Sequence, residues 1–375
     1  MTGGKLGLFK RLRISVRYFA TLGLVTTTIA VPTILLQSRN LASATNLRQS
    51  IQKPVSVPSN PTSSKGLIFA GPSRKTCVEL PKLPFINGAF PIASGVKAFE
   101  KQTGTSISCL TEYVNGALNW KQWEDPYITA PYAGVTTWVA ANPQNRQLVV
   151  QVDLIPLSLK NINNPLGWEQ SCAAGQFNSY AHRLGMNLVG AGLQNSVIRL
   201  GAEMNGPWET DFIGTTTKEQ KLWATCFSNE VTALRKTTGE HFLIDWNPNS
   251  CFENIPLKNF YPGNSHVDIL GLDLYDVSCA SPTTPVTWTR LANLPAGLVM
   301  FEAFANEHHK PMSFPEWGLF KTPKGDDPSF VNGIGSTIAS QDFAFEGYFD
   351  SGNDGTLPIG SESPLSLEAY KKWFS

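Results

Sequence analysis

Charged side chains are scarce in this chain: Asp, Glu, Lys and Arg make up 16% of its 375 residues, against about a quarter in ordinary soluble proteins. Asn, Ser, Thr, Gly and Pro take their place, so we expect a polar but largely neutral surface. The formal net charge is +1, and setting aside the five basic residues among the first 17 leaves −4 for the remainder. A mildly acidic body is unlike a nucleic-acid-binding protein, so we expect no nucleic-acid partner.

Several catalytic and metal-binding patterns are also missing. The sequence has no CxxC pair and no HExxH segment, which argues against the common zinc sites. It has no G-x-S-x-G nucleophile elbow and no phosphate-binding glycine loop. We therefore expect neither a metal nor an organic cofactor.

The N-terminus has the features of an export signal. Basic residues precede an apolar stretch over residues 18–36, and Ala42-Ser43-Ala44 follows as a signal-peptidase-type site. Two interpretations of residues 1–44 stay open: a signal peptide cleaved after Ala44, or a membrane anchor with its basic flank in the cytoplasm. Residues 45–83, rich in Ser, Pro, Asn and Gln, are predicted to form a flexible linker. The protein would then be extracellular or at the cell surface.

Six cysteines in an exported chain predict up to three disulfides, because the compartment is oxidising. Sequence alone does not give the pairing. Cys251 and Cys279 follow neighbouring predicted strands and are the pair that we favour. Buried free thiols are the alternative.

From about residue 84 the chain alternates strand-like and helix-like segments, which favours a (β/α)8 TIM barrel over residues 84–375. We also expect a monomer. The predicted strands are 85–90, 108–113, 147–155, 196–201, 241–246, 266–274, 311–315 and 343–349. The predicted helices are 96–103, 174–193, 217–236, 298–308, one capped by Asp327 with Pro328 at its first position, and 365–374.

Two glutamates stand out at the ends of the fourth and seventh predicted strands. Glu203 lies in Ser196-Val-Ile-Arg-Leu-Gly-Ala-Glu-Met-Asn-Gly-Pro-Trp208, and Glu316 lies in Lys310-Pro-Met-Ser-Phe-Pro-Glu-Trp-Gly318. Catalytic residues of such barrels lie at the carboxyl ends of strands. Two carboxyls there, beside tryptophans, are what the hydrolysis of a glycosidic bond needs. The plainer alternative is that both are ordinary polar residues at strand exits.

Other polar residues are expected to support the two carboxyls. Arg199 shares a strand face with Glu203 and would lower the pKa of a carboxylate within its reach, most plausibly that of Glu316. Tyr275, at the end of the sixth predicted strand, can donate a hydrogen bond to Glu316, and Asp273 shares its face. A structural role for Tyr275 and Asp273 stays open.

Candidate sugar-binding residues, Asp273 among them, surround these positions. Asn205 could contact a sugar hydroxyl or only form the turn with the following glycine. Trp208, Trp246 and Trp317 lie near predicted strand ends, where indole faces could stack on sugar rings. Each of these tryptophans could equally fill the core.

Three segments resemble glycoside hydrolase family 26 and its relatives among the clan A retaining glycosidases. Ile198-Arg-Leu-Gly-Ala-Glu-Met-Asn-Gly-Pro-Trp208 resembles the acid/base motif of that family, and Pro311-Met-Ser-Phe-Pro-Glu-Trp-Gly318 its nucleophile strand. The segment from Asp268 to Asp276 resembles its sixth strand, with the tyrosine that supports the nucleophile. The likeness extends weakly over about 85 to 375.

The resemblance implies that Glu203 is the acid/base and Glu316 the nucleophile of a retaining mechanism, with the carboxyls about 5–5.5 Å apart. It also implies that the pKa of Glu203 is raised. The mannanases of the family usually carry a histidine just before the acid/base, where this chain has Ala202. We expect a β-linked polysaccharide substrate: β-mannan or glucomannan first, with mixed-linkage glucan or an envelope exopolysaccharide as alternatives.

Two other functions stay open at this point. A catalytically weak polysaccharide-binding barrel is favoured only by Ala202, and a pure binder has no need of both carboxylates. A transglycosylase would use the same residues with a drier acceptor site, and sequence does not separate it from a hydrolase.

Overall fold

The structure is a computed structural model, and it describes residues 75–81, 83–114, 116–160, 166–250, 255–278, 281–294, 297–353 and 355–375. The predicted signal or anchor over 1–44, most of the predicted linker, Cys251 and Cys279 lie outside these ranges. Of the helices within them, none is both long enough and apolar enough to cross a membrane.

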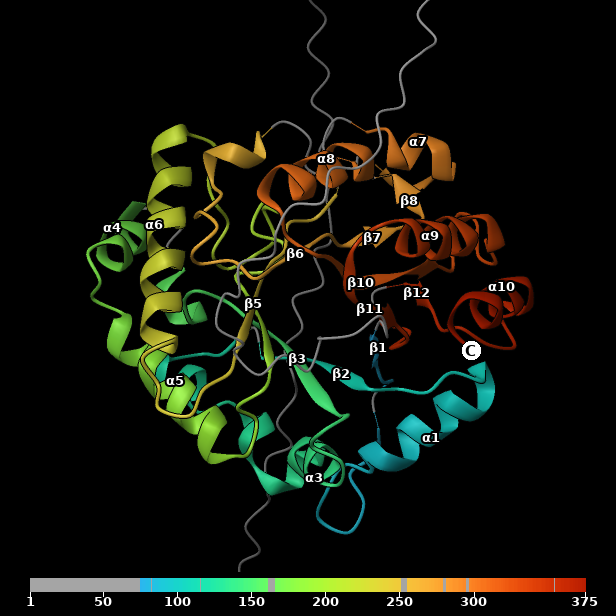
Figure 1. Cartoon of the computed structure of the whole chain (residues 1–375), viewed down its shortest axis with the longest axis horizontal. Helices are drawn as coiled ribbons and strands as arrows, with labels where there is room; N and C mark the ends of the chain where they lie inside the picture. Colours follow the sequence, from blue (N-terminus) through green and yellow to red (C-terminus); the bar gives the residue numbers. More distant parts are fainter. Residues whose placement is uncertain are drawn as a thin grey trace, which may run out of the picture. The chain divides into compact units, whose positions relative to one another are not determined.

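The described residues form a closed barrel of eight parallel strands. Each strand pairs with the next one around the barrel, and β11 pairs with both β10 and β1, which closes it. Figure 1 shows blue β1 beside red β11 at this closure. The barrel strands are β1 (Lys75–Glu79), β2 (Cys109–Tyr113), β3 (Gln147–Val152), β4 (Val197–Leu200), β5 (Leu243–Trp246), β6 (Ile269–Gly271), β10 (Met312–Phe320) and β11 (Phe343–Phe349).

Shorter strands extend the barrel at its edge. β7 (Leu274–Tyr275) follows β6 and pairs in parallel with β10, while β12 (Thr356–Leu357) pairs antiparallel with β10. β8 (Val277–Ser278) and β9 (Ser281–Pro285) form a separate antiparallel pair.

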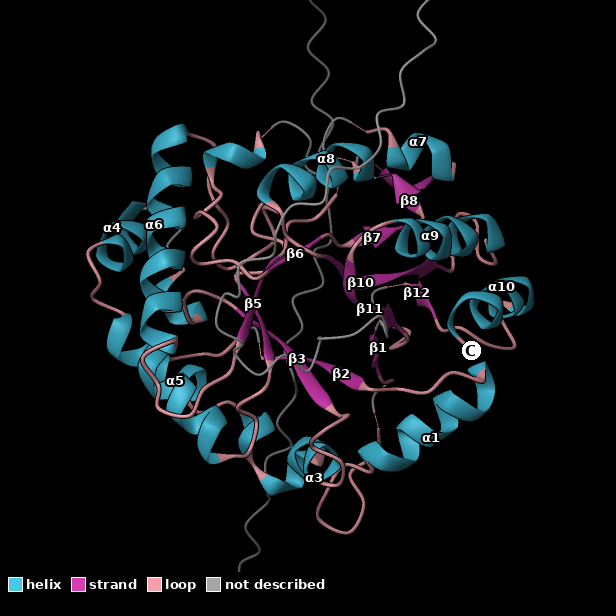
Figure 2. Cartoon of the chain, viewed as in Figure 1, coloured by secondary structure: helices cyan, strands magenta, loops and turns pink. Residues whose placement is uncertain are grey.

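Helices surround the strands, as Figure 2 shows. The α-helices are α1 (Ile92–Thr103), α2 (Trp120–Glu124), α3 (Val135–Ala140), α4 (Leu166–Ala173), α5 (Asn178–Gly190), α6 (Thr217–Leu234), α7 (Trp288–Ala292), α8 (Leu298–His308), α9 (Pro328–Ser340) and α10 (Pro364–Phe374). Short 3-10 helices are η1 (Tyr127–Thr129), η2 (Pro131–Ala133), η3 (Leu157–Leu159) and η4 (Leu257–Asn259). The (β/α)8 barrel predicted from the alternation is confirmed.

The predicted helix ends have clear local causes. The side chain of Asp327 accepts a hydrogen bond from the N–H of Phe330, and Pro328 takes the first helical position of α9. Thr216 and Glu219 form a reciprocal capping box at the start of α6. Gly104, with φ of 73°, ends α1 in the left-handed conformation that favours glycine.

The prediction of the first strand at 85–90 is wrong. The first barrel strand is β1, which lies inside the segment predicted as a linker, and 85–90 belongs to the connection from β1 to α1. β1 has the sequence Lys-Thr-Cys-Val-Glu, which lacks the apolar run of the other strands. Its pairing with β2 and β11, which lie 30 or more residues away in sequence, places it in the barrel.

Two disulfides confirm the predicted oxidised cysteines. Cys77–Cys109 joins register partners on β1 and β2, and Cys172–Cys226 joins α4 to α6. The favoured pair Cys251–Cys279 lies outside the described residues and stays a prediction.

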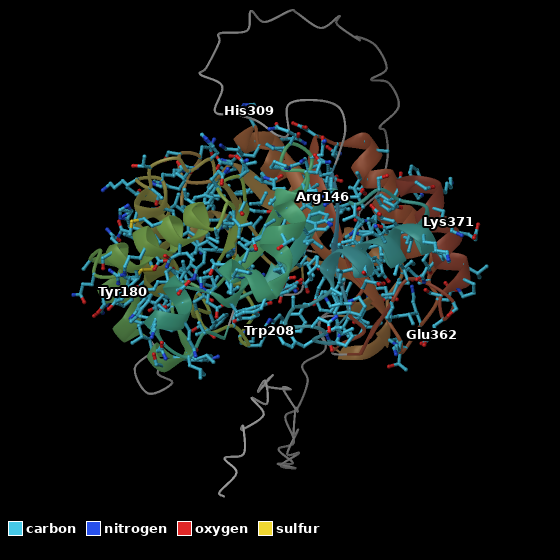
Figure 3. The ribbon with its side chains drawn as sticks, turned by 90° about the horizontal axis from the view of Figure 1, so that it is seen from below. Arg146, Tyr180, Trp208, His309, Glu362 and Lys371 are labelled. Carbon is cyan, nitrogen blue, oxygen red and sulfur yellow. A yellow bond between two sulfur atoms is a disulfide. The ribbon has the colours of Figure 1, made fainter. Side chains whose placement is uncertain are left out.

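The barrel interior changes from apolar to polar along the strands. Near the strand starts, Val149, Val197 and the Cys77–Cys109 disulfide belong to one buried apolar cluster. Two residues further along β4, and therefore on the same strand face, lies the fully buried Arg199. The polar layer sits toward the carboxyl ends of the strands. Figure 3 shows that end at its lower edge, where Trp208 lies in the loop after β4 and Glu362 in the loop between β12 and α10, with His309 at the opposite edge.

Candidate active site

Glu316 lies within β10 and is surrounded by hydrogen-bond donors and a cation. The hydroxyl of Tyr275 donates to its Oε1 over 2.5 Å, and the hydroxyl of Tyr113 donates to its Oε2 over 2.7 Å. Arg199 Nη1 lies 3.5 Å from Oε2. Burial and the negative charge of Glu316 raise the pKa of both tyrosines well above the ordinary value, so both keep the protons that they donate. Both oxygens of the Glu316 carboxyl therefore accept hydrogen bonds, and a cation lies beside one of them.

Glu203 lies in the turn that follows β4, where its backbone is held in an unusual conformation. Its φ is +55°, a left-handed value that costs free energy in a residue with a side chain. Its N–H donates to the carbonyl of Asn247, which follows β5, over 2.7 Å. The alternation of side chains along β4, which would place Arg199 and Glu203 on one strand face, therefore does not extend to Glu203. The hydrogen bond to Asn247 holds the backbone of Glu203 in place instead.

The Glu203 carboxyl accepts hydrogen bonds from two neutral side chains. The indole N–H of Trp208 donates to Oε2 over 3.0 Å, and the amide of Asn249 donates to Oε1. No Arg or Lys in the described part of the chain forms an ion pair with it. Burial, and then the nearby negative charge of Glu316, raise the pKa of Glu203 to about 7. A pKa near 7 lets a large fraction of Glu203 keep its proton at neutral pH, unlike an ordinary glutamate.

The two glutamates are close together. One carboxyl oxygen from each of Glu203, Asp273 and Glu316 lies within 4.8 Å of the other two. We call these three residues the site carboxyls. This separation is shorter than the roughly 6.5–9.5 Å between the carboxyls of inverting glycosidases, which hold the attacking water between the two groups.

A buried ion pair lies beneath this pair of glutamates. Arg199 Nη2 contacts Asp273 Oδ2 at 2.6 Å, and Arg199 Nε donates to Asn247 over 2.7 Å. Arg199 and Asp273 are both fully buried. Because one guanidinium contacts both Asp273 and Glu316, it compensates negative charge within the group.

The structure separates the predicted sugar-binding residues into exposed and buried ones. Trp208 is 37% exposed beside Glu203 and offers an indole face to solvent. Trp246 packs against Phe260, and the Trp317 indole N–H donates to Glu346; both indoles are fully buried. Each follows an inward-facing residue of its strand, so each points out of the barrel toward the helices.

Asn205 and Asp273 are also buried rather than open to a substrate. The Asn205 side chain exchanges two hydrogen bonds with the backbone of Asn249, at 2.7 and 2.8 Å. It thereby ties the loop after β4 to the loop after β5. Asp273 is bound to Arg199, as described above. Both residues position the site from below.

Sequence reasoning missed Tyr113, Asn247 and Asn249. All three lie at or just after the ends of predicted strands, which is the signal that could have found them. Tyr113 ends β2, two positions beyond the inward-facing Thr111. The two asparagines follow β5.

With this geometry in place, residues 141–303 match the model of glycosyl hydrolase family 26. The match covers less than half of the chain and marks this part of it as similar to that family. The matched residues contain Glu203 and Tyr275 and end before Glu316. None of the curated proteins matches the sequence. The family match, together with the fold shared with solved mannanases, supports a glycoside hydrolase of the β-glycanase type.

Solved structures of mannanases share the fold of this chain. An endo-β-1,4-mannanase double mutant from Cellulomonas fimi is 18% identical with a TM-score of 0.55, covering 80% of this chain and 70% of that one. A β-mannanase from Bacteroides ovatus is 13% identical with a TM-score of 0.52, covering 80% and 88%. The catalytic domain of a Bacillus sp. JAMB-750 endo-β-1,4-mannanase is 16% identical with a TM-score of 0.55, covering 82% and 86%.

Proposed function

We propose that the chain is a retaining endo-β-glycanase in which Glu203 is the acid/base and Glu316 the nucleophile. One observation carries the proposal. The carboxyl oxygens of Glu203 and Glu316 lie within 4.8 Å of each other, but the surroundings of the two residues differ. Glu316 lies beside a cation and two tyrosine donors, whereas burial and the charge of Glu316 raise the pKa of Glu203 to about 7. Such a difference separates the roles of a nucleophile and a proton donor.

The reaction takes two steps on these two residues. In the first, the Glu316 carboxylate attacks the anomeric carbon while Glu203 gives its proton to the departing glycosidic oxygen, which leaves a glycosyl ester on Glu316. In the second, Glu203 removes a proton from water, and the hydroxide oxygen attacks the same carbon and releases Glu316. Water enters one product, and the anomeric configuration is retained.

The pKa of Glu203 must fall between the two steps. The negative charge of Glu316 raises this pKa in the resting site. Once Glu316 is an uncharged ester, that repulsion disappears, and Glu203 loses its proton more readily. The short distance between the two carboxyls therefore lets one residue serve first as acid and then as base.

We propose β-mannan or glucomannan as the substrate, with mixed-linkage glucan and envelope exopolysaccharide as the alternatives to test. The family match and the fold shared with the mannanases above support this choice. The exposed Trp208 beside the acid/base provides an apolar surface for a sugar ring. Ala202, where a histidine is usual, is 1% exposed and offers no polar group to the sugar, which makes the alternatives worth testing.

The proposed place of action is outside the cytoplasm. Two disulfides in the described residues fit an oxidising compartment. Protease treatment of intact cells tests this: degradation of the chain while a cytoplasmic marker survives would agree, and protection until lysis would contradict it.

Reducing-end release from a panel of polysaccharides tests the reaction. The panel holds β-mannan, glucomannan, mixed-linkage glucan, xylan and the envelope polysaccharide, each with the wild-type chain and with Glu316→Ala. We expect release from one class that is lost in the variant. Glu346→Gln, a buried carboxyl outside the site, is the matched control and should keep its activity. Release that survives in Glu316→Ala would refute the assignment.

A further inference from the structure

A second group of three carboxyls lies beside the active site. Asp153 follows β3, and Glu209 and Asp211 lie in the loop after β4. One carboxyl oxygen from each lies within 4.8 Å of the other two. We call this group the second carboxyl cluster. It takes no part in the reaction described above.

Two oxygens of the second carboxyl cluster are buried without a partner. Asp153 Oδ2 accepts the N–H of Gly116 over 3.1 Å, and Asp211 Oδ2 accepts the N–H of Leu154 over 2.9 Å. The other oxygen of each aspartate, Oδ1, has no donor in good hydrogen-bond geometry among the residues that the structure describes, although the Thr210 side chain lies near enough to Asp153 to lower its pKa. Asp153 is 3% exposed and Asp211 is fully buried. Buried polar atoms of this kind normally have a partner, so the cluster is incomplete as it stands.

The nearest cation does not complete the cluster. Lys160 is exposed, and its Nζ donates to the backbone carbonyls of Trp208 and Glu209, at 3.3 and 3.1 Å. No Lys or Arg in the described ranges forms an ion pair with the three carboxyls. Burial and the repulsion of Asp211 accordingly raise the pKa of Asp153 to about 8.

We propose that Asp153, Glu209 and Asp211 bind a divalent cation of the calcium type. The cluster offers only oxygen atoms, which Ca²⁺ prefers and softer metals do not. Ca²⁺–oxygen distances are about 2.4 Å, so two ligands on opposite sides of one ion stand about 4.8 Å apart. The three oxygens therefore fit around a single ion, and Glu209, at 9% exposure, gives the path by which the ion and its waters enter.

The ion would act on the loop that carries the acid/base. Glu209 follows Trp208, whose indole N–H donates to Glu203. Gly201, at the start of the same loop, has φ of 57°, and a Cβ there would lie 2.8 Å from Asp211 Oδ2. The ion would tie this loop to the end of β3 without touching the substrate, so its role is to position Trp208 and Glu203.

Metal binding is tested directly on the full chain after removal of metals with a chelator. Terbium is a luminescent substitute for Ca²⁺ that nearby tryptophans can excite. Trp208 precedes Glu209, and the indole N–H of Trp123 donates to the Asp153 carbonyl, so both indoles lie close to the proposed ion. We expect tryptophan-excited terbium emission that saturates at one ion per chain and is displaced by Ca²⁺. Absence of emission, together with absence of a calorimetric signal for Ca²⁺, Mg²⁺ and Mn²⁺, would overturn the proposal.

Variants then locate the ion. In wild type, Ca²⁺ at 100 times its Kd should raise Tm by about 5 °C. Asp211→Asn should abolish the rise, and Glu209→Gln, at the least buried position, should weaken terbium binding at least tenfold even if Asp211→Asn fails to fold. Glu346→Gln, another buried carboxyl, should behave as wild type. Unchanged Ca²⁺ affinity in Glu209→Gln would place the ion elsewhere and refute the assignment.

Discussion

Two groups of three carboxyls lie near the same end of the barrel, and each keeps its nearest oxygens within 4.8 Å. Among the site carboxyls, Arg199 contacts both Asp273 and Glu316, and two tyrosines donate to Glu316. In the second carboxyl cluster, only backbone N–H groups donate to the two aspartates in the interactions described above. Similar spacing therefore comes with very different compensation of charge.

This difference separates two uses of buried acids. Among the site carboxyls, a guanidinium and two tyrosine donors contact Glu316, whereas only neutral donors contact Glu203, whose pKa is raised to about 7. Such unequal surroundings suit acid/base chemistry. Where no such side chains are present, as in the second carboxyl cluster, the compensating charge that we propose is a cation from solution. Single substitutions among the site carboxyls and their hydrogen-bond donors test this difference one contact at a time.

Removing the nucleophile should have the largest effect. Glu316→Ala should lower kcat by about 10⁴-fold or more, because no other group can form the glycosyl ester. The measurement is reducing-end release on the substrate identified from the panel. Circular dichroism and Tm should confirm a folded variant, and a loss of less than tenfold would show that Glu316 is not the nucleophile.

Removing the proton of Glu203 should come next. Glu203→Gln should lower kcat on the polysaccharide by about 10²–10⁴-fold. In wild type the protonated acid is the active form, so kcat/KM should fall as pH rises through the pKa of about 7. This alkaline limb should vanish in the variant, and its persistence at the same pH would assign it to another group.

Removing the hydroxyl of Tyr275 or Tyr113 should lower kcat, whereas removing the hydroxyl of Tyr261, which does not contact the site, should not. Tyr275→Phe should lower kcat about 10–100-fold, since a hydrogen bond to a charged group contributes about 1.5–3 kcal/mol. Tyr113→Phe should have a similar or smaller effect, because Arg199 also contacts Oε2, the oxygen that Tyr113 serves. Tyr261→Phe, whose hydroxyl donates to Asn264, should leave kcat unchanged. Equal losses in all three would indicate general destabilisation.

The smallest effect is expected at the indole N–H. Trp208→Phe keeps an aromatic face but removes the donor to Glu203 Oε2, a contact that lowers the pKa of Glu203. The alkaline limb of the pH–rate profile should therefore move to higher pH, with kcat changed by about tenfold or less. A limb that stays in place or moves to lower pH would contradict the role given to this hydrogen bond.

Strongly patterned segments were predictable from the sequence. The predicted helix 298–308 and strand 343–349 coincide with α8 and β11, because their apolar residues recur with the period of each element. Glu203 and Glu316 were found because each follows an apolar strand and precedes glycine and tryptophan. β1 was missed because tertiary pairing, not local composition, makes it a strand.

The contacts within the site depend on the stagger between strands, which sequence does not specify. Tyr113 reaches Glu316 over a separation of 203 residues, and Asn249 reaches Glu203 because the loops after β4 and β5 meet. Strand alternation could have assigned Trp317, since the neighbour of an inward Glu316 must face outward. The second carboxyl cluster escaped notice because Asp153 is separated from Glu209 and Asp211 by more than 50 residues without a metal-binding spacing.

Azide rescue tests the assignment of the two glutamates most directly. Both Glu316→Ala and Glu203→Ala would be given an aryl β-glycoside of the released sugar, with and without azide, and the products followed by NMR. We predict an inverted α-glycosyl azide from Glu316→Ala, because azide replaces the missing nucleophile, and a β-glycosyl azide from Glu203→Ala, because azide attacks the ester on Glu316. The opposite pairing of products, or a β-azide from Glu316→Ala, would contradict the account.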